Sequence, residues 1–212
     1  YEGPFGVGYG ICAYTVKGRD LKRNFKEQYE EKEKNRIMEL RRQEDEYVQL
    51  ARKTVEEYVR TGKKIRIPEG LSGEMLERRA GVFVSIKKEG RLRGCIGTIQ
   101  AVYPSIAQEI IENGVSAATR DPRFSPIEPE ELDKLTITVD VLGDTEKINS
   151  PDKLDVRRYG VVVTKGFKRG LLLPNLEGVD TVEEQIAIAK QKAGIGEQEQ
   201  EELERFEVVR HY

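Results

Sequence analysis

The chain has 212 residues, 35% of them charged, and its 36 basic side chains nearly balance its 38 acidic ones, giving a formal net charge of −2. This length fits one sizeable domain with extensions. The balanced charge gives no overall field toward nucleic acid or membranes, and the apolar runs are too short to span a bilayer. One histidine and two cysteines, Cys12 and Cys95, exclude most zinc sites, most Ser-His or Cys-His arrangements and a disulfide framework.

From this composition we expect a cytoplasmic protein without a bound metal or cofactor, although pairing of the two cysteines stays open. The first residues alternate glycine with apolar side chains. They lack the strand, the helix and the downstream acid of a phosphate-binding loop. We interpret residues 1–16 as the C-terminal remnant of an upstream domain, which here would be a severed edge strand or a flexible tail.

Residues 17–44 carry alternating charges of both signs and a thin apolar stripe that includes Phe25, Tyr29, Ile37 and Leu40. Oppositely charged side chains four residues apart support an exposed helix. The stripe is too narrow for a buried face, so we predict a solvated helical linker, with binding of a partner helix as the alternative.

The domain itself is predicted over residues 45–212. Its first helix spans Asp45 to Gly62, where glycine is typical of a C-terminal cap. Ser72 is placed to cap a brief helix through Arg79. An amphipathic helix follows over residues 104–119 and ends before Pro122, because proline disfavours helical geometry at the preceding residue.

The stretch least like ordinary packing is residues 91–98, a second strand joined to the β-branched run 81–88 by the turn residues Glu89 and Gly90. A period of two places Arg91, Arg93, Cys95 and Gly97 on one face, unless a bulge at a glycine shifts that parity. Two arginines beside Cys95 would favour its thiolate. The alternative is a small buried side chain whose flanking glycines allow close packing.

The string Leu92-Arg93-Gly94-Cys95-Ile96-Gly97 matches the six-residue signature of the AMMECR-type domain family, named after the AMME syndrome candidate protein. The similarity continues through residues 121–124 and 170–174, and it covers about residues 45 to 210. The resemblance implies an α+β fold with a larger and a smaller subdomain and with the signature lining a cleft. It fixes a family rather than an activity.

Asp121-Pro122-Arg123-Phe124 is a second candidate for function. A carboxylate and a guanidinium fixed by proline at a helix end could orient a substrate or pair with Arg93. The alternative is a capping turn with Phe124 as a core side chain.

The rest of the chain predicts a short helix over residues 129–134, a half-buried strand over 135–142, and a hairpin around the basic loop 165–168, which we take as solvated. It then predicts a helix opened by a capping box of Thr181 and Glu184, an exposed acidic helix over 197–204, and a last strand over 206–209. Strands arranged in hairpins favour an α+β fold, with a mainly antiparallel sheet flanked by helices.

Two hypotheses for function remain. The first residues resemble the C-terminus of Memo-like proteins and class III extradiol-dioxygenase B subunits, and AMMECR-type domains are associated with a Memo-like protein and a radical-SAM enzyme in the AmmeMemoRadiSam system. We prefer a substrate- or partner-binding module. The alternative is an enzyme that uses Cys95 as nucleophile or covalent anchor and Arg93 as charge stabiliser. In either case the predicted binding residues are Gly94, Gly97, Thr98, Asp121 and Arg123.

Overall fold

The computed structural model of the chain describes residues 12–15, 18, 24–176 and 178–212. Most of the predicted remnant, residues 1–16, lies outside the described residues. The helices are α1 (Phe25–Arg42), α2 (Glu46–Thr61), α3 (Gly73–Glu77), α4 (Ile106–Thr119) and α5 (Val182–Ala193), with the 3-10 helices η2 (Pro129–Lys134) and η3 (Pro151–Lys153). The strands are β1 (Val82–Lys88), β2 (Arg91–Gly97), β3 (Leu135–Leu142), β4 (Glu146–Ile148), β5 (Tyr159–Lys165), β6 (Lys168–Leu172) and β7 (Glu202–His211).

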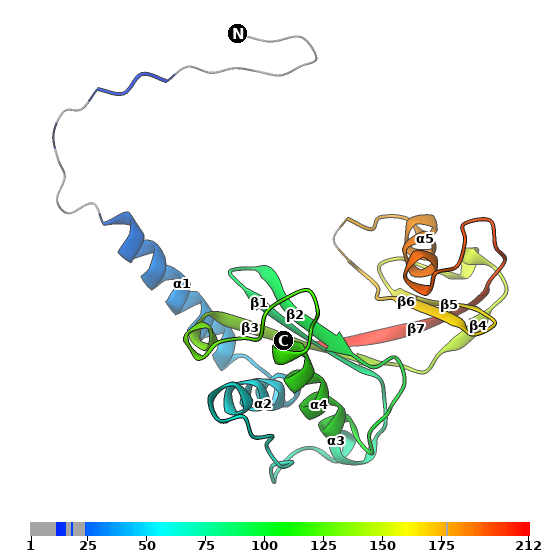
Figure 1. Cartoon of the computed structure of the whole chain (residues 1–212), viewed down its shortest axis with the longest axis horizontal. Helices are drawn as coiled ribbons and strands as arrows, with labels where there is room; N and C mark the ends of the chain where they lie inside the picture. Colours follow the sequence, from blue (N-terminus) through cyan, green and yellow to red (C-terminus); the bar gives the residue numbers. More distant parts are fainter. Residues whose placement is uncertain (1–11, 16–17, 19–23, 177) are drawn as a thin grey trace.

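The strands form one sheet in the order β2-β1-β3-β7-β5-β6, with β4 also paired to β7. Every pairing between described strands is antiparallel. Figure 1 shows two lobes joined by β7, the larger with α2, α3 and α4 and the smaller with α5. The predicted α+β fold with a mainly antiparallel sheet and two subdomains is confirmed.

The larger lobe buries one face of β1, β2 and β3 under α2 and α4. The carboxylate of Asp45 accepts hydrogen bonds from the amides at the start of α2, and Gly62 ends the helix with φ of +71°. The C-terminal cap at Gly62 is as predicted, and the structure adds the side-chain cap by Asp45. Along α2, Val48, Ala51 and Val55 are fully buried, so the helix contributes a continuous apolar face to the core.

The smaller lobe packs α5 on β5 and β6. Thr181 and Glu184 form the predicted capping box, and Gly194 ends the helix in the left-handed conformation. Ala189 in the middle of α5 is fully buried against the strands. The lobe therefore has a small apolar core of its own.

The last strand corrects one prediction. Residues 197–204 do not form an acidic helix: a turn precedes Glu202, and β7 continues for ten residues to His211. The Nζ of Lys190 donates to the carbonyl oxygens of Glu197 and Glu199, which holds this turn against α5. Pairing of β7 with β5 and β3 outweighs the helical preference of its glutamates.

Two helices differ in detail from the prediction. Ser72 sits at the N-cap of α3, but its Oγ makes no capping bond, and the helix ends at Glu77 instead of Arg79. The predicted linker helix exists as α1, yet it is not wholly solvated, because Ile37 is only 5% exposed. No helix in the described part of the chain is long and apolar enough to cross a membrane.

The face of the sheet opposite α2 and α4 carries a third apolar cluster that joins the two lobes. Its buried members are Leu142, Val162, Leu171 and Phe206, bordered by Phe83, Ile99, Leu173 and Val208. This face is where the signature thiol lies.

Candidate functional site

The signature strand β2 contains a bulge. Ile86 of β1 pairs with Gly94, whereas the next residue, Lys87, pairs with Leu92, so Arg93 has no partner across the ladder. An extra residue reverses the alternation of side chains. The predicted shared face of Arg91 and Cys95 is therefore wrong, and the bulge adjoins Gly94, one of the two glycines at which such a shift was foreseen.

Both signature glycines are explained by close packing. A Cβ on Gly94 would lie 2.1 Å from the carbonyl oxygen of Ala117 in α4, and a Cβ on Gly97 would lie 2.3 Å from the ring of Phe83. Any side chain at these positions would force backbone or ring atoms apart. The binding roles predicted for Gly94 and Gly97 remain predictions, since packing alone requires glycine there.

Cys95 lies on the face opposite α2 and α4, directly across from Ser85, which pairs in turn with Thr138 of β3. All three side chains are partly exposed. The Oγ of Ser85 donates a hydrogen bond to the Sγ of Cys95 at 3.2 Å. A thiol and two hydroxyls therefore form a row across three strands, which we name the hydroxyl-thiol row (Cys95, Ser85 and Thr138). Both Cys95 and Cys12 are free thiols.

Asp121 and Arg123 cap the open edge of β2 at Cys95. The amide of Cys95 donates to Oδ2 of Asp121 at 2.9 Å, and Nη2 of Arg123 donates to the carbonyl oxygen of Cys95 at 3.2 Å. Nε and Nη2 of Arg123 also bond both oxygens of Asp121, at 2.9 and 2.7 Å. The hydrogen bond from Arg123 is the main cause that holds the pKa of Asp121 well below its usual range.

Arg93 bonds elsewhere, so the predicted pair with Asp121 does not form. Its Nε and Nη2 donate to the two oxygens of Glu131 in η2 at 3.1 and 2.8 Å, and its Nη1 and Nη2 reach the carbonyl oxygens of Ser125 and Pro126. Glu131 also accepts from Lys88. Hydrogen bonding by Arg93 is the main cause that lowers the pKa of Glu131 to about 2.

The arginine that contacts Cys95 is instead Arg123, through the carbonyl oxygen of Cys95. The pKa of Arg123 is raised first by its bond to Asp121 and, in smaller part, by the thiol of Cys95. Arg123 keeps 54% of its side chain exposed, whereas Arg93 keeps 15%. Of the two arginines, Arg123 is thus the one that can meet a ligand beside Cys95.

Thr98, the last predicted binding residue, belongs to a buried polar cluster. Its Oγ1 donates to Oε2 of Glu109 at 2.7 Å, and Glu109 is fully buried in the first turn of α4. The same carboxylate accepts from the amides of Val102 and Tyr103 and from the side chain of Asn113. Thr98 therefore fastens the loop that follows the signature strand.

Residues 48–211 match the AMMECR1 family, which is more than half of the chain. The chain belongs to the AMMECR1 family. Its AMMECR1 domain holds the signature strand, the edge cap and η2.

Two relatives of this chain differ in how much of their length the match covers. Protein CA_C1420 of Clostridium acetobutylicum is 46% identical over the whole of this chain, which spans 45% of that relative. A protein of Thermotoga maritima is 50% identical, and the match covers 79% of this chain and 98% of that protein. The chain thus spans less than half of one relative and nearly all of the other.

A solved structure has the same fold. The uncharacterized protein PH0010 from Pyrococcus horikoshii superposes with a TM-score of 0.71 at 36% identity, covering 77% of this chain and 88% of that one. None of these names states an activity, so the similarity carries the family and fold.

The histidine of the AMMECR1 domain lies on the other face of the sheet from Cys95. His211 pairs with Val139, whose side chain belongs to the core under the helices. The ring stacks on Tyr47 at 3.8 Å, and Nδ1 lies 2.5 Å from Oδ2 of Asp45. It cannot act as the base for the thiol. In the described ranges, no three His, Cys, Asp or Glu side chains are arranged to hold a metal ion.

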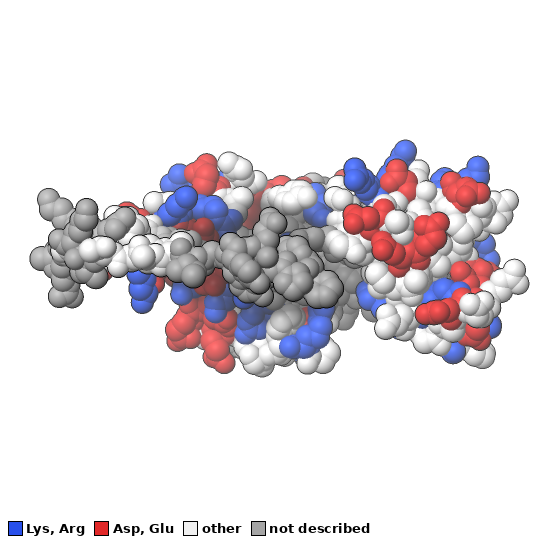
Figure 2. Space-filling model, turned by 90° about the horizontal axis from the view of Figure 1, so that it is seen from above, with Lys and Arg blue, Asp and Glu red and all other residues white. Residues whose placement is uncertain are grey.

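Two cavities lie in the smaller lobe. One, of about 480 Å³, is lined by residues of β4, η3 and β7, and the second, of about 240 Å³, adjoins it at Glu146 and Arg205. Neither includes a signature residue, so the cleft implied by the resemblance remains a prediction. On the face in Figure 2, the acidic and basic side chains of the described residues are interspersed and form no continuous basic stripe.

Sequence reasoning missed Glu131, Ser85 and Glu109 as parts of this region. Glu131 and Glu109 look like ordinary helix-start carboxylates, and only the fold brings them to Arg93 and Thr98. Ser85 could have been found, because the predicted hairpin places it close to Cys95 on the neighbouring strand.

Proposed function

We propose that the chain is a substrate- or partner-binding module whose contact surface is the hydroxyl-thiol row with Arg123 at its edge. The observation that carries the proposal is the pairing of the charges around Cys95. Arg93 is matched by Glu131, and Asp121 is matched by Arg123. What this leaves open is a set of neutral hydrogen-bonding groups on a rigid sheet, which suits recognition more than acid-base chemistry.

The nearby carboxylates are also poor bases. The pKa of Glu131 is lowered to about 2, and that of Asp121 lies below its usual range, in each case chiefly because a guanidinium bonds the ionised form. A catalytic thiol needs a group that takes its proton. A binding surface does not have this requirement.

By the resemblance to the AmmeMemoRadiSam system, we propose a Memo-like domain and a radical-SAM enzyme as partners. The test is the affinity of both proteins, taken from one genome, for the wild type and for the double variant Ser85→Ala, Thr138→Val. These changes remove two hydroxyls of the row and little volume, so we expect affinity to fall at least tenfold with the melting temperature nearly unchanged. A Ser150→Ala variant in the smaller lobe is the control. Unchanged affinity in the double variant would refute the proposed surface.

The second candidate is an enzyme with Cys95 as nucleophile or covalent anchor, favoured by the half-exposed Arg123 beside the thiol. It predicts a covalent adduct on Cys95, detectable by mass spectrometry after incubation with cell extract. The adduct should disappear in Cys95→Ser. No adduct on the wild-type thiol would count against this candidate.

A further inference from the structure

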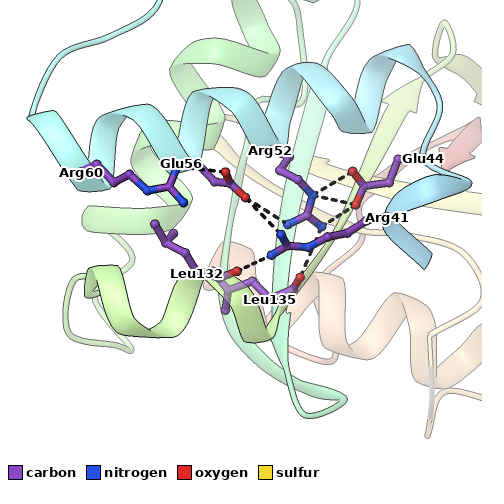
Figure 3. A network of polar contacts seen from close by, with 7 residues as sticks. All are labelled: Arg41, Glu44, Arg52, Glu56, Arg60, Leu132 and Leu135. Atoms are coloured by element: carbon purple, nitrogen blue, oxygen red, sulfur yellow. Dashed lines mark hydrogen bonds and ion pairs between the residues drawn. The ribbon is translucent and has the colours of Figure 1, made fainter. Parts of the chain in front are cut away.

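The C-terminal end of α1 is fastened to the AMMECR1 domain by the polar network of Figure 3. Nη2 of Arg41 donates to the carbonyl oxygen of Leu132 in η2 at 2.6 Å, and Nη1 lies 3.6 Å from a carboxylate oxygen of Glu56 in α2. One turn earlier, Ile37 is buried. Arg41 therefore joins three helical segments at one point.

A second arginine braces the same network. Nε of Arg52 donates to both oxygens of Glu44 at 2.8 Å, and its Nη2 reaches the carbonyl oxygen of Leu135 at 3.3 Å. Arg52 and Arg60 both pair with Glu56, at 3.8 and 3.1 Å. Because the carboxylate of Glu56 is shared between Arg41, Arg52 and Arg60, moving one of these side chains disturbs the others.

The short helix η2 is held from its other side by the signature strand. Glu131, the residue before Leu132, receives the forked bond from Arg93 and a bond from Lys88. Consecutive residues of η2 thus face α1 and the signature. A six-residue 3-10 helix has few bonds of its own, so these two clamps add to the buried side chain of Leu132 in fixing its position.

From this arrangement we propose that Arg41 is a positioning residue for the Cys95 site, acting through η2 on Arg93. The inference rests on the proposed function, since it concerns the same surface. Arg41 lies outside the segment that matches the family, residues 48–211. Displacing α1 would release the carbonyl oxygen of Leu132 in η2, loosen Glu131 and with it the bulge that sets the direction of Cys95.

The test compares Arg41→Met with Arg42→Met in a Cys12→Ser background, which leaves one thiol. Arg42 is the matched control, because it is the next residue of the same helix, is 70% exposed and pairs only with Glu39 among the described residues. Two readouts are needed. They are amide hydrogen exchange over residues 121–134 and the rate at which a maleimide labels Cys95.

For Arg41→Met we expect at least fivefold faster exchange over residues 121–134 and at least a threefold change in labelling rate, with both unchanged in Arg42→Met. Arg41→Lys, which can keep the bond to Leu132 and lose the contact with Glu56, should be intermediate. Equal behaviour of Arg41→Met and Arg42→Met would overturn the inference. If partner binding fails in the wild type, the proposed function falls, while exchange and labelling still decide the role of Arg41.

Discussion

Two edge hairpins of the sheet, β1–β2 in the larger lobe and β5–β6 in the smaller, solve one packing problem in the same way. Gly94 of β2 and Gly170 of β6 each bring the strand backbone against a helix, and an added Cβ would lie 2.1 Å and 2.2 Å from the carbonyl oxygens of Ala117 and Ala189. A glycine packed on a helix is therefore a feature of the fold in both lobes. It does not by itself mark a functional site.

The hairpins differ in what surrounds the glycine. β2 has a bulge at Arg93 and an edge capped by Asp121 and Arg123. In the part of the chain that the structure describes, no side chain makes a comparable bond to the backbone of β6. The difference teaches that the distinctive part of the signature is the fixed backbone at Cys95, which holds a thiol at one place on the exposed face.

The largest effect expected from this comparison is on stability. Gly94→Ala and Gly170→Ala should each lower the free energy of unfolding by about 3 kcal/mol, because a carbonyl oxygen cannot move away from the new methyl group. Gly73→Ala is the control, since a Cβ there meets nothing within 4 Å. Urea titration measures all three. If alanine left the free energy of unfolding unchanged at only one of Gly94 and Gly170, the two hairpins would not share this packing requirement.

The edge cap should come next. Asp121→Asn keeps the shape of the side chain and removes the charge that binds Arg123 and the amide of Cys95. We expect a loss of about 1–2 kcal/mol at neutral pH, because Asp121 is buried while its partner is half exposed. Arg169→Gln, which breaks the pair between the hairpin of the smaller lobe and Glu204 of β7, should cost less. The measurement is urea unfolding of both variants. A larger loss of stability in Arg169→Gln than in Asp121→Asn would show that the cap is unimportant.

Low pH should destabilise the fold by protonating Glu131, the partner of Arg93. The pKa of Glu131 is lowered to about 2, chiefly by Arg93, so its ionised form stabilises the fold above the unfolded pKa of about 4. That stability is lost as the pH falls from about 4 toward 2. Glu131→Gln should flatten the pH profile of the urea midpoint over this range. A profile as steep as that of the wild type would contradict the assignment.

Glu199 in the smaller lobe supplies the comparison. Its pKa is also lowered to about 2, chiefly by a hydrogen bond from Lys165, but this pair lies on the surface. Salt screens exposed charges more than partly buried ones. In 0.5 M sodium chloride the effect of Glu199→Gln should vanish while that of Glu131→Gln persists, and equal screening of both would show that Glu131 is not shielded.

The smallest effect on stability is expected at Ser85. Ser85→Ala removes the hydrogen bond to the thiol of Cys95 on a partly exposed surface, and it should cost under about 1 kcal/mol. Its consequence should appear in the labelling rate of Cys95 instead. A large loss of stability with an unchanged labelling rate would make the hydroxyl a structural group.

These contrasts separate what the sequence predicts from what it cannot. The hairpin of β1 and β2, the strand β3, and the caps at Gly62 and Thr181 follow from signals a few residues long, and all are present. The extent of β7 does not follow from such local signals. Its first residues have the pattern of a helix, and only their pairing with β5 makes them a strand.

The candidate site, too, can be predicted only in part from local sequence patterns. Local pattern identifies Cys95 and its glycines as unusual, but the bulge shifts the strand by one residue, and that shift decides which side chains share the face of the thiol. The partners Glu131 for Arg93 and Glu109 for Thr98 are distant from the signature in sequence. Such pairings depend on the folded chain, and residue spacing carries no signal for them.

We propose Cys95 as a hydrogen-bonding member of the recognition surface. This role is tested most directly by the affinity of the proposed partners, a radical-SAM enzyme and a Memo-like protein, for the wild type, Cys95→Ser and Cys95→Val. We predict that Cys95→Ser binds within threefold of the wild type, whereas Cys95→Val, which cannot hydrogen-bond, binds at least tenfold more weakly at a similar melting temperature. Equal binding by all three would contradict the account.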